Sequence, residues 1–252
     1  MKRVIPILLI LFFFCAKDEA PTERPNRFLN SLKHASEIST VERLTQDGRC
    51  ISPMFAPGDT IIYFRRLLAP DNEAASGKEI EDLIKPFGIN INTMELLTVS
   101  ADYEYPPPSY ADTSKLPEIG GESVTMGINS PDSGVIAFET DENGPSQKRK
   151  IYIYDNDRLS QLTYGDISCY LEKISNSGRY ISALLDWNPS WIIIFDLESG
   201  ENYIIERENE LIDYMTSFSS DDRMMVFIRS EGRYIIDGSV FGDIWLFRFK
   251  QQ

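Results

Sequence analysis

The chain has 252 residues, 42% of them hydrophobic, and 25 Lys and Arg against 39 Asp and Glu give a formal net charge of −14. This acidic balance argues against nucleic acid as a partner, because phosphates must be met by Lys and Arg. The one histidine and three cysteines exclude most histidine-based catalytic and metal sites, so we expect no metal, no cofactor and no enzymatic activity.

The amino terminus predicts export. The basic residues Lys2 and Arg3 precede an uncharged apolar run, VIPILLILFFF, at residues 4–14. A helix of that length is too short for a ~30 Å hydrocarbon core, which takes about 20 residues, but it suits a signal sequence.

Cys15 follows the run, and the next residues are polar. Residues 1–15 therefore resemble a bacterial lipoprotein signal, in which the cysteine is diacylated and becomes the mature amino terminus. This family prefers a small residue before the cysteine and Leu three before it, whereas this chain has Phe14 and Phe12. The resemblance implies lipidation at Cys15, a lipid anchor to the membrane, and a periplasmic or outer-membrane location. The alternatives are an ordinary export signal and an uncleaved anchor.

A polar tether is expected at residues 16–40, with a helix around Phe28–Ile38, before a domain at residues 41–252. That domain contains apolar runs rich in Ile, Val, Tyr and Phe between Asp, Asn, Gly and Ser turns, which is typical of β-strands. Four copies of a strand–turn–strand pattern lie at residues 53–66, 127–140, 172–186 and 216–230. Third strands are predicted at residues 89–96, 150–155, 191–196 and 243–249.

The copies resemble the TolB-like β-propeller repeat, whose pattern is a Ser-Pro-Asp-Gly turn, an apolar strand, an Ile-Tyr strand and a closing Leu-Thr. The second copy matches best, with the turn Ser130–Gly134, the strand Ile151–Asp155 and the closing Leu162-Thr163. The last three copies recur within the ~40–50-residue period of a propeller blade. The resemblance therefore implies an all-β propeller.

Four blades are predicted, and the last would be completed by Val41–Thr45, because its own sequence ends after three strands. The blades lie at about residues 46–100, 101–165, 166–208 and 209–252 plus 41–45. The alternatives are a partial propeller, which another chain could complete, and a β-sandwich.

Two insertions interrupt the first interval of the repeat. Ile80, Leu83, Ile84 and Phe87 have helical spacing, so residues 69–88 predict a short amphipathic helix that packs as a lid. Residues 101–122 read as a loop rich in Pro and Tyr.

Aromatic side chains in loops often contribute to recognition surfaces because they offer large contact areas at low entropic cost. The candidate binding residues are Tyr103, Tyr105 and Tyr110 on the 101–122 loop and Trp187 and Trp191 at a hairpin of the third copy.

Other chemically notable residues have structural interpretations. His34 is expected to be exposed and passive. Cys50 and Cys169 are expected to be buried and unpaired, and the many acids are expected to be solvated turn residues.

The sequence thus predicts a lipid-anchored β-propeller that acts as a binding or scaffold module of the bacterial cell envelope. Its partners would be envelope proteins or a glycan, not nucleic acid, and the sequence does not determine the oligomeric state. The alternative is a glycan-acting hydrolase or lyase that uses carboxylates at the propeller mouth.

Overall fold

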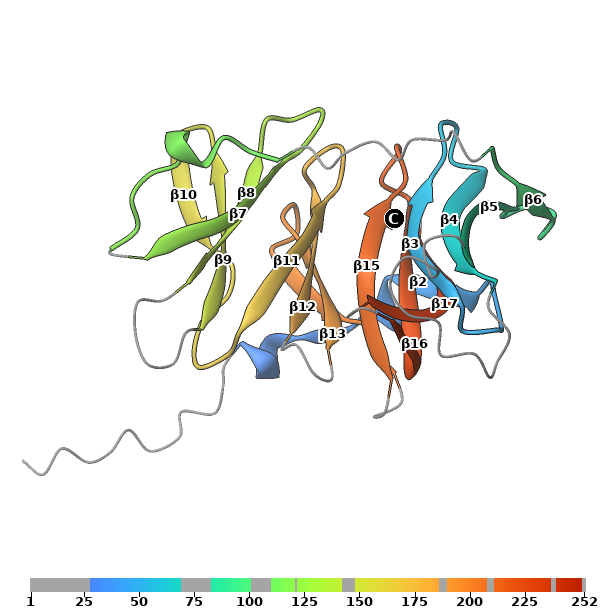
Figure 1. The fold of residues 1–252 in the computed structure, drawn as a ribbon. Coiled ribbons are helices and arrows are strands. Elements are labelled where there is room, and N and C mark those ends of the chain that lie inside the picture. The colour runs from blue at the N-terminus through green and yellow to red at the C-terminus, as the bar shows by residue number, and fades with distance from the viewer. Residues whose placement is uncertain are drawn as a thin grey trace, which may run out of the picture.

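The protein is all-β (Figure 1). The computed structural model describes residues 28–68, 83–100, 110–120, 122–141, 148–185, 190–207, 211–236 and 239–250, without the side chains of 232–239. No helix of these residues is long and apolar enough to cross a membrane.

Four antiparallel meanders, here called units 1 to 4, follow the four copies of the repeat within the described residues. Unit 1 consists of β3 (Cys50–Phe55), β4 (Ile61–Leu67), β5 (Ile84–Asn90) and β6 (Leu96–Thr98). Unit 2 consists of β7 (Ser123–Asn129), β8 (Ile136–Asp141), β9 (Arg149–Asp155) and β10 (Arg158–Gln161). Unit 3 consists of β11 (Cys169–Ile174), β12 (Tyr180–Leu185), β13 (Trp191–Asp196) and β14 (Glu201–Ile204). Unit 4 consists of β15 (Ile212–Phe218), β16 (Met224–Ile236), β17 (Ser239–Phe249) and β2 (Ser39–Arg43).

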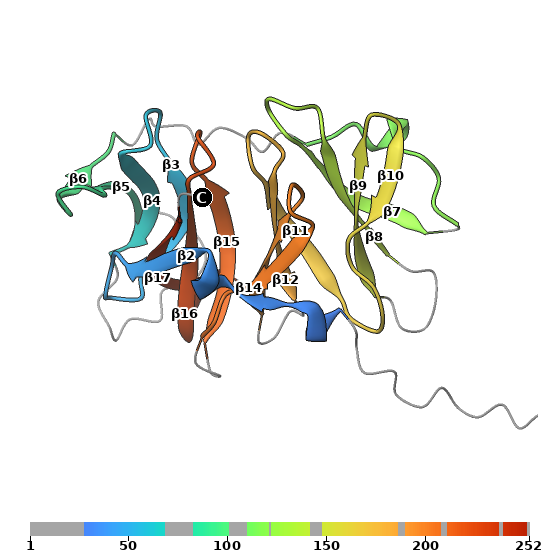
Figure 2. The same cartoon turned by 180° about the vertical axis from the view of Figure 1, so that it is seen from behind.

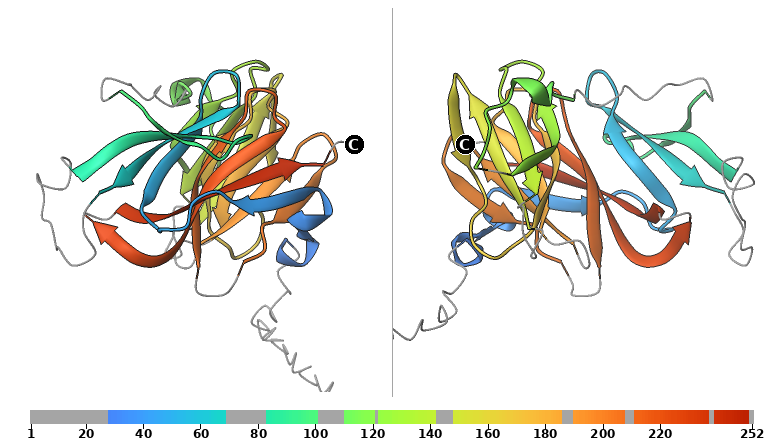
Figure 3. Two further views of the ribbon diagram at one scale, coloured as in Figure 1. Left: turned by 90° about the vertical axis from the view of Figure 1, so that its right-hand side faces the viewer. Right: turned by 60° about the vertical axis from the view of Figure 1, so that its left-hand side comes forward.

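The units stack face to face in the order 2, 3, 4, 1, as Figures 1 and 2 show. Figure 3 shows units 1 and 2 at the two ends of this stack. A separate apolar cluster of buried side chains joins each neighbouring pair. Representative pairs are Ile151 with Ile181 between units 2 and 3, Ile194 with Phe227 between units 3 and 4, and Phe64 with Val226 between units 4 and 1.

The amino-terminal arm, residues 28–45, lies across units 3 and 4. It contains η1 (Leu29–Ser31), β1 (Lys33–His34), η2 (Ala35–Glu37) and β2. Phe28 stacks on Phe195 with ring centroids 6.1 Å apart, and Ala35 joins the cluster between units 3 and 4. Residues 28–40, predicted as part of a tether with a helix, therefore form two short 3₁₀ turns and two strands, because Phe28 and Ala35 are buried on the sheets.

The predicted pairing of the 41–45 segment with the last unit is confirmed. β2 runs antiparallel to β17, with Val41 opposite Phe247, and the Leu44 amide donates to the Ile244 carbonyl. This pairing covers an edge of unit 4 that would otherwise expose unpaired backbone groups.

Units 4 and 1 share one eight-stranded sheet, because β17 also pairs with β3 where Gly242 lies opposite Cys50. A Cβ at Gly242 would lie 2.5 Å from the Arg229 carbonyl oxygen, so the close approach requires glycine. None of the sheets closes on itself.

The helix predicted at residues 69–88 is wrong for residues 84–88, which form part of a β-strand. Ile84 and Phe87 lie in β5, which pairs with β4 along its whole length, and residues 69–82 lie outside the described residues. The third strand predicted at residues 89–96 is also displaced. β5 ends at Asn90, whose side-chain oxygen accepts the Asn92 amide (2.9 Å) in a turn.

Each first strand of a unit contains a β-bulge, which leaves backbone N–H groups outside the ladder. The preceding unit supplies acceptors for two of these groups. Glu139 Oε2 accepts the Leu171 amide at 2.9 Å, and Glu172 Oε2 accepts the Thr216 amide at 3.1 Å. These carboxylates therefore tie unit 2 to unit 3 and unit 3 to unit 4.

Burial of the carboxyl group raises the pKa of Glu172 above its ordinary value of 4.5. The carboxyl group is buried even though Glu172, averaged over all its atoms, is only half-buried. The folded state then binds a proton more tightly than the unfolded state, so this group destabilises the fold as the pH rises through the folded pKa. Glu172→Gln keeps an acceptor for Thr216 and has no charge. We expect the variant to be more stable than the wild type above neutral pH, and the difference to vanish at acidic pH. Urea unfolding at both pH values measures this, and a pH-independent difference would contradict it.

Candidate functional site

The turn between the first and second strands of every unit lies on one side of the molecule, at the top of Figure 1. These turns are residues 56–60, 130–134, 175–179 and 219–223, and we call their common surface the turn face. They are the Ser-, Pro-, Asp- and Gly-rich turns of the sequence repeat, so the repeat itself builds this surface.

Asp222 of unit 4 holds the turn of unit 3. Its carboxylate accepts hydrogen bonds from Ser175 Oγ (2.9 Å), the Asn176 amide (2.9 Å) and both the amide (3.1 Å) and hydroxyl of Ser177. The backbone of Asp222 has a φ of 57°, in the left-handed region that Asp tolerates better than most residues. This conformation aims the carboxylate at the neighbouring unit.

Asp59 occupies the same repeat position in unit 1 and makes the equivalent contact. Its φ is 54°, and its carboxylate accepts the Ser220 amide (2.9 Å) and hydroxyl of unit 4. Between units 2 and 3, Ser130 Oγ (2.6 Å) and the Asp132 amide (3.0 Å) both donate to the Asn176 carbonyl. Hydrogen bonds therefore connect all four turns into one surface.

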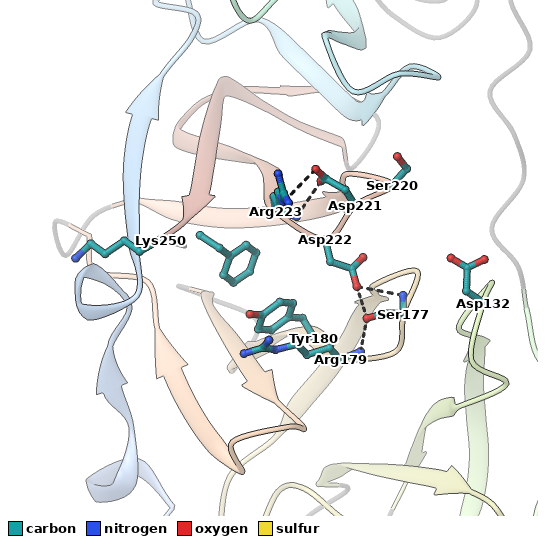
Figure 4. Close-up of a pocket in the computed structure, with 10 residues that line it drawn as sticks. Asp132, Ser177, Arg179, Tyr180, Ser220, Asp221, Asp222, Arg223 and Lys250 are labelled. Carbon is teal, nitrogen blue, oxygen red and sulfur yellow. Dashed lines mark hydrogen bonds and ion pairs between the residues drawn. The ribbon is translucent and has the colours of Figure 1, made fainter. Parts of the chain in front are cut away.

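A hollow of about 650 Å³ opens on this face. Figure 4 shows its lining, which comes from the turns of units 2, 3 and 4 and the end of β17: Asp132, Ser177, Arg179, Tyr180, Ser220, Asp221, Asp222, Arg223, Phe249 and Lys250. This volume lies within the range of small-ligand sites, roughly 300–1,000 Å³.

The aromatic wall of the hollow is fixed. Tyr180 stacks on Phe249, with ring centroids 4.2 Å apart and an interplanar angle of 15°. The Arg179 guanidinium lies 4.8 Å from the Tyr180 ring and makes a two-pronged contact with Asp196 at 3.0 and 3.1 Å. That hydrogen bonding raises the pKa of Arg179, and burial raises the pKa of Tyr180.

The rim carries exposed charges of both signs. Asp132 is exposed, and Asp221 lies 3.6 Å from Arg223 in an ion pair whose members are 46% and 68% exposed. Such a pair contributes little stability and can exchange partners with a ligand. Lys250 Nζ is held by the Ser36 carbonyl at 2.6 Å. The hollow can therefore bind a ligand that offers both acidic and basic groups.

The structure does not bring the predicted aromatic residues together in this hollow. Tyr103, Tyr105 and Trp187 lie outside the described residues, as does the lipidation candidate Cys15. Tyr110 is 62% exposed and pairs through its backbone with Ile128.

Trp191 opens β13 opposite Leu185, at the end of unit 3 away from the turn face, and the Arg207 guanidinium lies 5.2 Å from its ring. Arg179, Arg223 and the Tyr180–Phe249 pair were not predicted from the sequence. A usable signal existed, because Arg is the last residue of the turn in both the third and fourth copies.

The remaining predictions concern histidine, cysteine and metal. His34 is exposed as expected, and its Nδ1 lies against the Glu206 carboxylate. Cys50 and Cys169 are buried and form no disulfide with each other, which confirms their predicted placement. Among the described residues, no three His, Cys, Asp or Glu side chains are grouped so that they could hold a metal ion.

Replacing Asp222 tests the hydrogen bonds between the turns. Asp222→Ala removes the acceptor of four hydrogen bonds, so we expect a loss of about 1–3 kcal/mol in the free energy of unfolding. Asp132→Ala, at the same face, is the matched control and should change stability by less than about 0.5 kcal/mol. Urea unfolding compares the two, and equal losses would show that Asp222 does not hold the turns together.

No family model matches the sequence, and no curated protein is significantly similar to it. Several solved structures are distantly similar. TolB from Acinetobacter baumannii is 16% identical with a TM-score of 0.31, and the match covers 84% of this chain but 46% of the TolB chain. An oligogalacturonate lyase from Vibrio parahaemolyticus is 14% identical with a TM-score of 0.36, over 81% of this chain and 67% of the lyase. The β-propeller domain of the Trilobed protease from Pyrococcus furiosus is 16% identical with a TM-score of 0.30, over 71% and 48%. At these identities and TM-scores, the likenesses carry no activity over to this chain.

Proposed function

We propose that this chain is a binding module of the bacterial cell envelope, exported and anchored through Cys15, which holds a polypeptide partner in the hollow of its turn face. The four units are interpreted as blades of a partial propeller. The observation that carries the proposal is the hollow itself: a preformed cavity of about 650 Å³, lined by residues of three units.

The rigidity of the hollow supports binding. Asp222, which lines it, is fixed by four hydrogen bonds, and the Tyr180–Phe249 stack fixes the opposite wall. A ligand would therefore lose little free energy in ordering the site, which favours affinity.

The mixed charges of the rim favour a polypeptide. Asp132 and Asp221 suit a basic side chain, while Arg223 suits a carboxylate. A polypeptide segment carries both groups on one backbone, and arginine is enriched at protein interfaces. The same acids do not favour a glycan-acting enzyme, because Asp222 is occupied as a structural acceptor and Asp221 pairs with Arg223.

The position of the arm is compatible with an anchor. The described chain begins with the amino-terminal arm, whose blue segment starts at the bottom of Figure 1, whereas the turn face is at the top. A membrane tether that enters there would leave the hollow accessible to partners.

If the protein is anchored by lipid, Cys15 must be acylated. We expect the wild type to partition with membranes and the mature amino terminus to be a diacylated cysteine, because acyl chains contribute about 0.8 kcal/mol per buried CH₂. Cys15→Ser should be soluble or unprocessed. Mass spectrometry of the mature amino terminus decides the matter, and an unmodified Cys15 or a start elsewhere would refute the anchor.

The binding proposal predicts that a partner depends on the rim charges. We expect photo-crosslinking of the full chain in native envelopes, from a probe at Ser220, to give a discrete adduct with one protein. The double variant Asp132→Ala, Arg223→Ala should reduce this adduct about tenfold or more, a loss of about 1.4 kcal/mol in binding.

The matched control is Arg158→Ala, Asp166→Ala, which removes the same charges outside the hollow. It should leave the adduct unchanged. An adduct that survives the rim variant, or falls equally in the control, would remove the hollow as the binding site.

A further inference from the structure

We infer that the stack is permanently open between units 1 and 2, because residues 110–120 and Glu122 of this chain take the place on unit 2 that a neighbouring unit would occupy. Three apolar clusters join units 2 and 3, 3 and 4, and 4 and 1, whereas no cluster of the described residues joins units 1 and 2. Two independent features of the sequence account for this open seam.

The first feature is a segment that covers the face of unit 2 turned away from unit 3. We call this segment, residues 110–120 and Glu122, the plug. Ala137 and Ile151 face unit 3, so Phe138 and Tyr152, which neighbour them along the strands, face the other way. Both are nonetheless buried, with 0% and 6% exposure, and they stack with ring centroids 5.6 Å apart.

Tyr110 and Ala111 pair with the free edge of β7, where Tyr110 lies opposite Ile128, and the side chains of Ala111 and Thr113 reach this face. The position of a Cβ added at Gly127 would be 3.1 Å from Ala111 Cβ, 3.4 Å from Thr113 Cγ2 and 3.6 Å from Phe138 Cβ, so the four residues meet at one point. The Ala111 amide donates to the Gly127 carbonyl at 2.9 Å.

Glu122 fastens the other end of the plug. Its carboxylate accepts the Thr140 hydroxyl and, at 3.3 Å, the Tyr152 hydroxyl. Both donors belong to the same face of unit 2 as Phe138. The face that would receive unit 1 is therefore covered by the connection that leads from unit 1.

The second feature is the absence of a turn contact at the seam. Asp59 and Asp222 each reach back to the turn of the adjacent unit, but unit 2 has Ser133 at their repeat position. Ser133 Oγ donates to Ser130 Oγ at 2.8 Å, within its own turn.

Unit 1 also lacks the groups that such a contact would need. Ala56 and Pro57 stand where unit 3 has Ser175 and Asn176, so a hydroxyl and a backbone N–H are both missing. A second copy of this chain meets the same obstacles. Copies therefore cannot complete a ring by placing unit 1 of one against unit 2 of the next.

Distances between turns test the open seam directly. Full chains in a Cys15→Ser background would carry spin labels at Pro57→Cys with Pro131→Cys across the seam, or at Pro57→Cys with Ser220→Cys between adjacent units. Residues 57, 131 and 220 occupy the same repeat position, so a closed symmetric ring gives equal distances. We expect the seam distance to be the longer of the two, and equal distances would overturn the proposal.

Removing the Glu122 carboxylate tests whether the plug covers unit 2. Glu122→Ala should accelerate amide hydrogen exchange in β8 and β9 about tenfold, because Thr140 and Tyr152 lose their acceptor, while exchange in β16 and β17 stays unchanged. Glu122→Gln keeps an acceptor and should restore slow exchange. Unchanged exchange in Glu122→Ala would show that the plug does not seal unit 2.

Discussion

Carboxylates of one unit that accept backbone N–H groups of a neighbouring unit determine how this molecule is assembled. Apolar burial drives the sheets together but has no direction, so it cannot by itself fix which sheet follows which. A hydrogen bond to an ionised acceptor is directional and roughly twice as strong as a neutral one. Asp59 and Asp222 supply such bonds at the turn face, and the side-chain oxygens of Glu139 and Glu172 accept backbone N–H groups at the bulges. Order and register of the stack follow from these four acids.

The candidate site is a consequence of the same contacts. Once the turn of unit 3 is held by Asp222, the side chains that follow it, Arg179 and Tyr180, are brought against Phe249 at the end of unit 4. The amino-terminal arm then spans units 3 and 4, and the plug seals unit 2. The hollow is therefore formed between units that are fixed on both sides.

Local signals in the sequence were sufficient for strands and turns but not for contacts between distant segments. The strand predicted at residues 191–196 matches β13, because a run of β-branched and aromatic residues bounded by turn residues has few alternatives. The helix predicted around Ile84 and Phe87 failed because the segment pairs with β4 along its length, and this tertiary contact overrides the local helical spacing. The hollow was missed because its lining comes from three units, so no single segment shows it.

Native-state hydrogen exchange at the amides that these acids accept is the most direct test of the account. The amides of Asn176, Ser177 and Ser220 lie in turns, two of them on exposed residues, where exchange is ordinarily fast. If carboxylates hold the units together, these amides should be protected nearly as strongly as those of the buried strands β12 and β16. Exchange at the rate of an unprotected turn would contradict the central role of the turn aspartates.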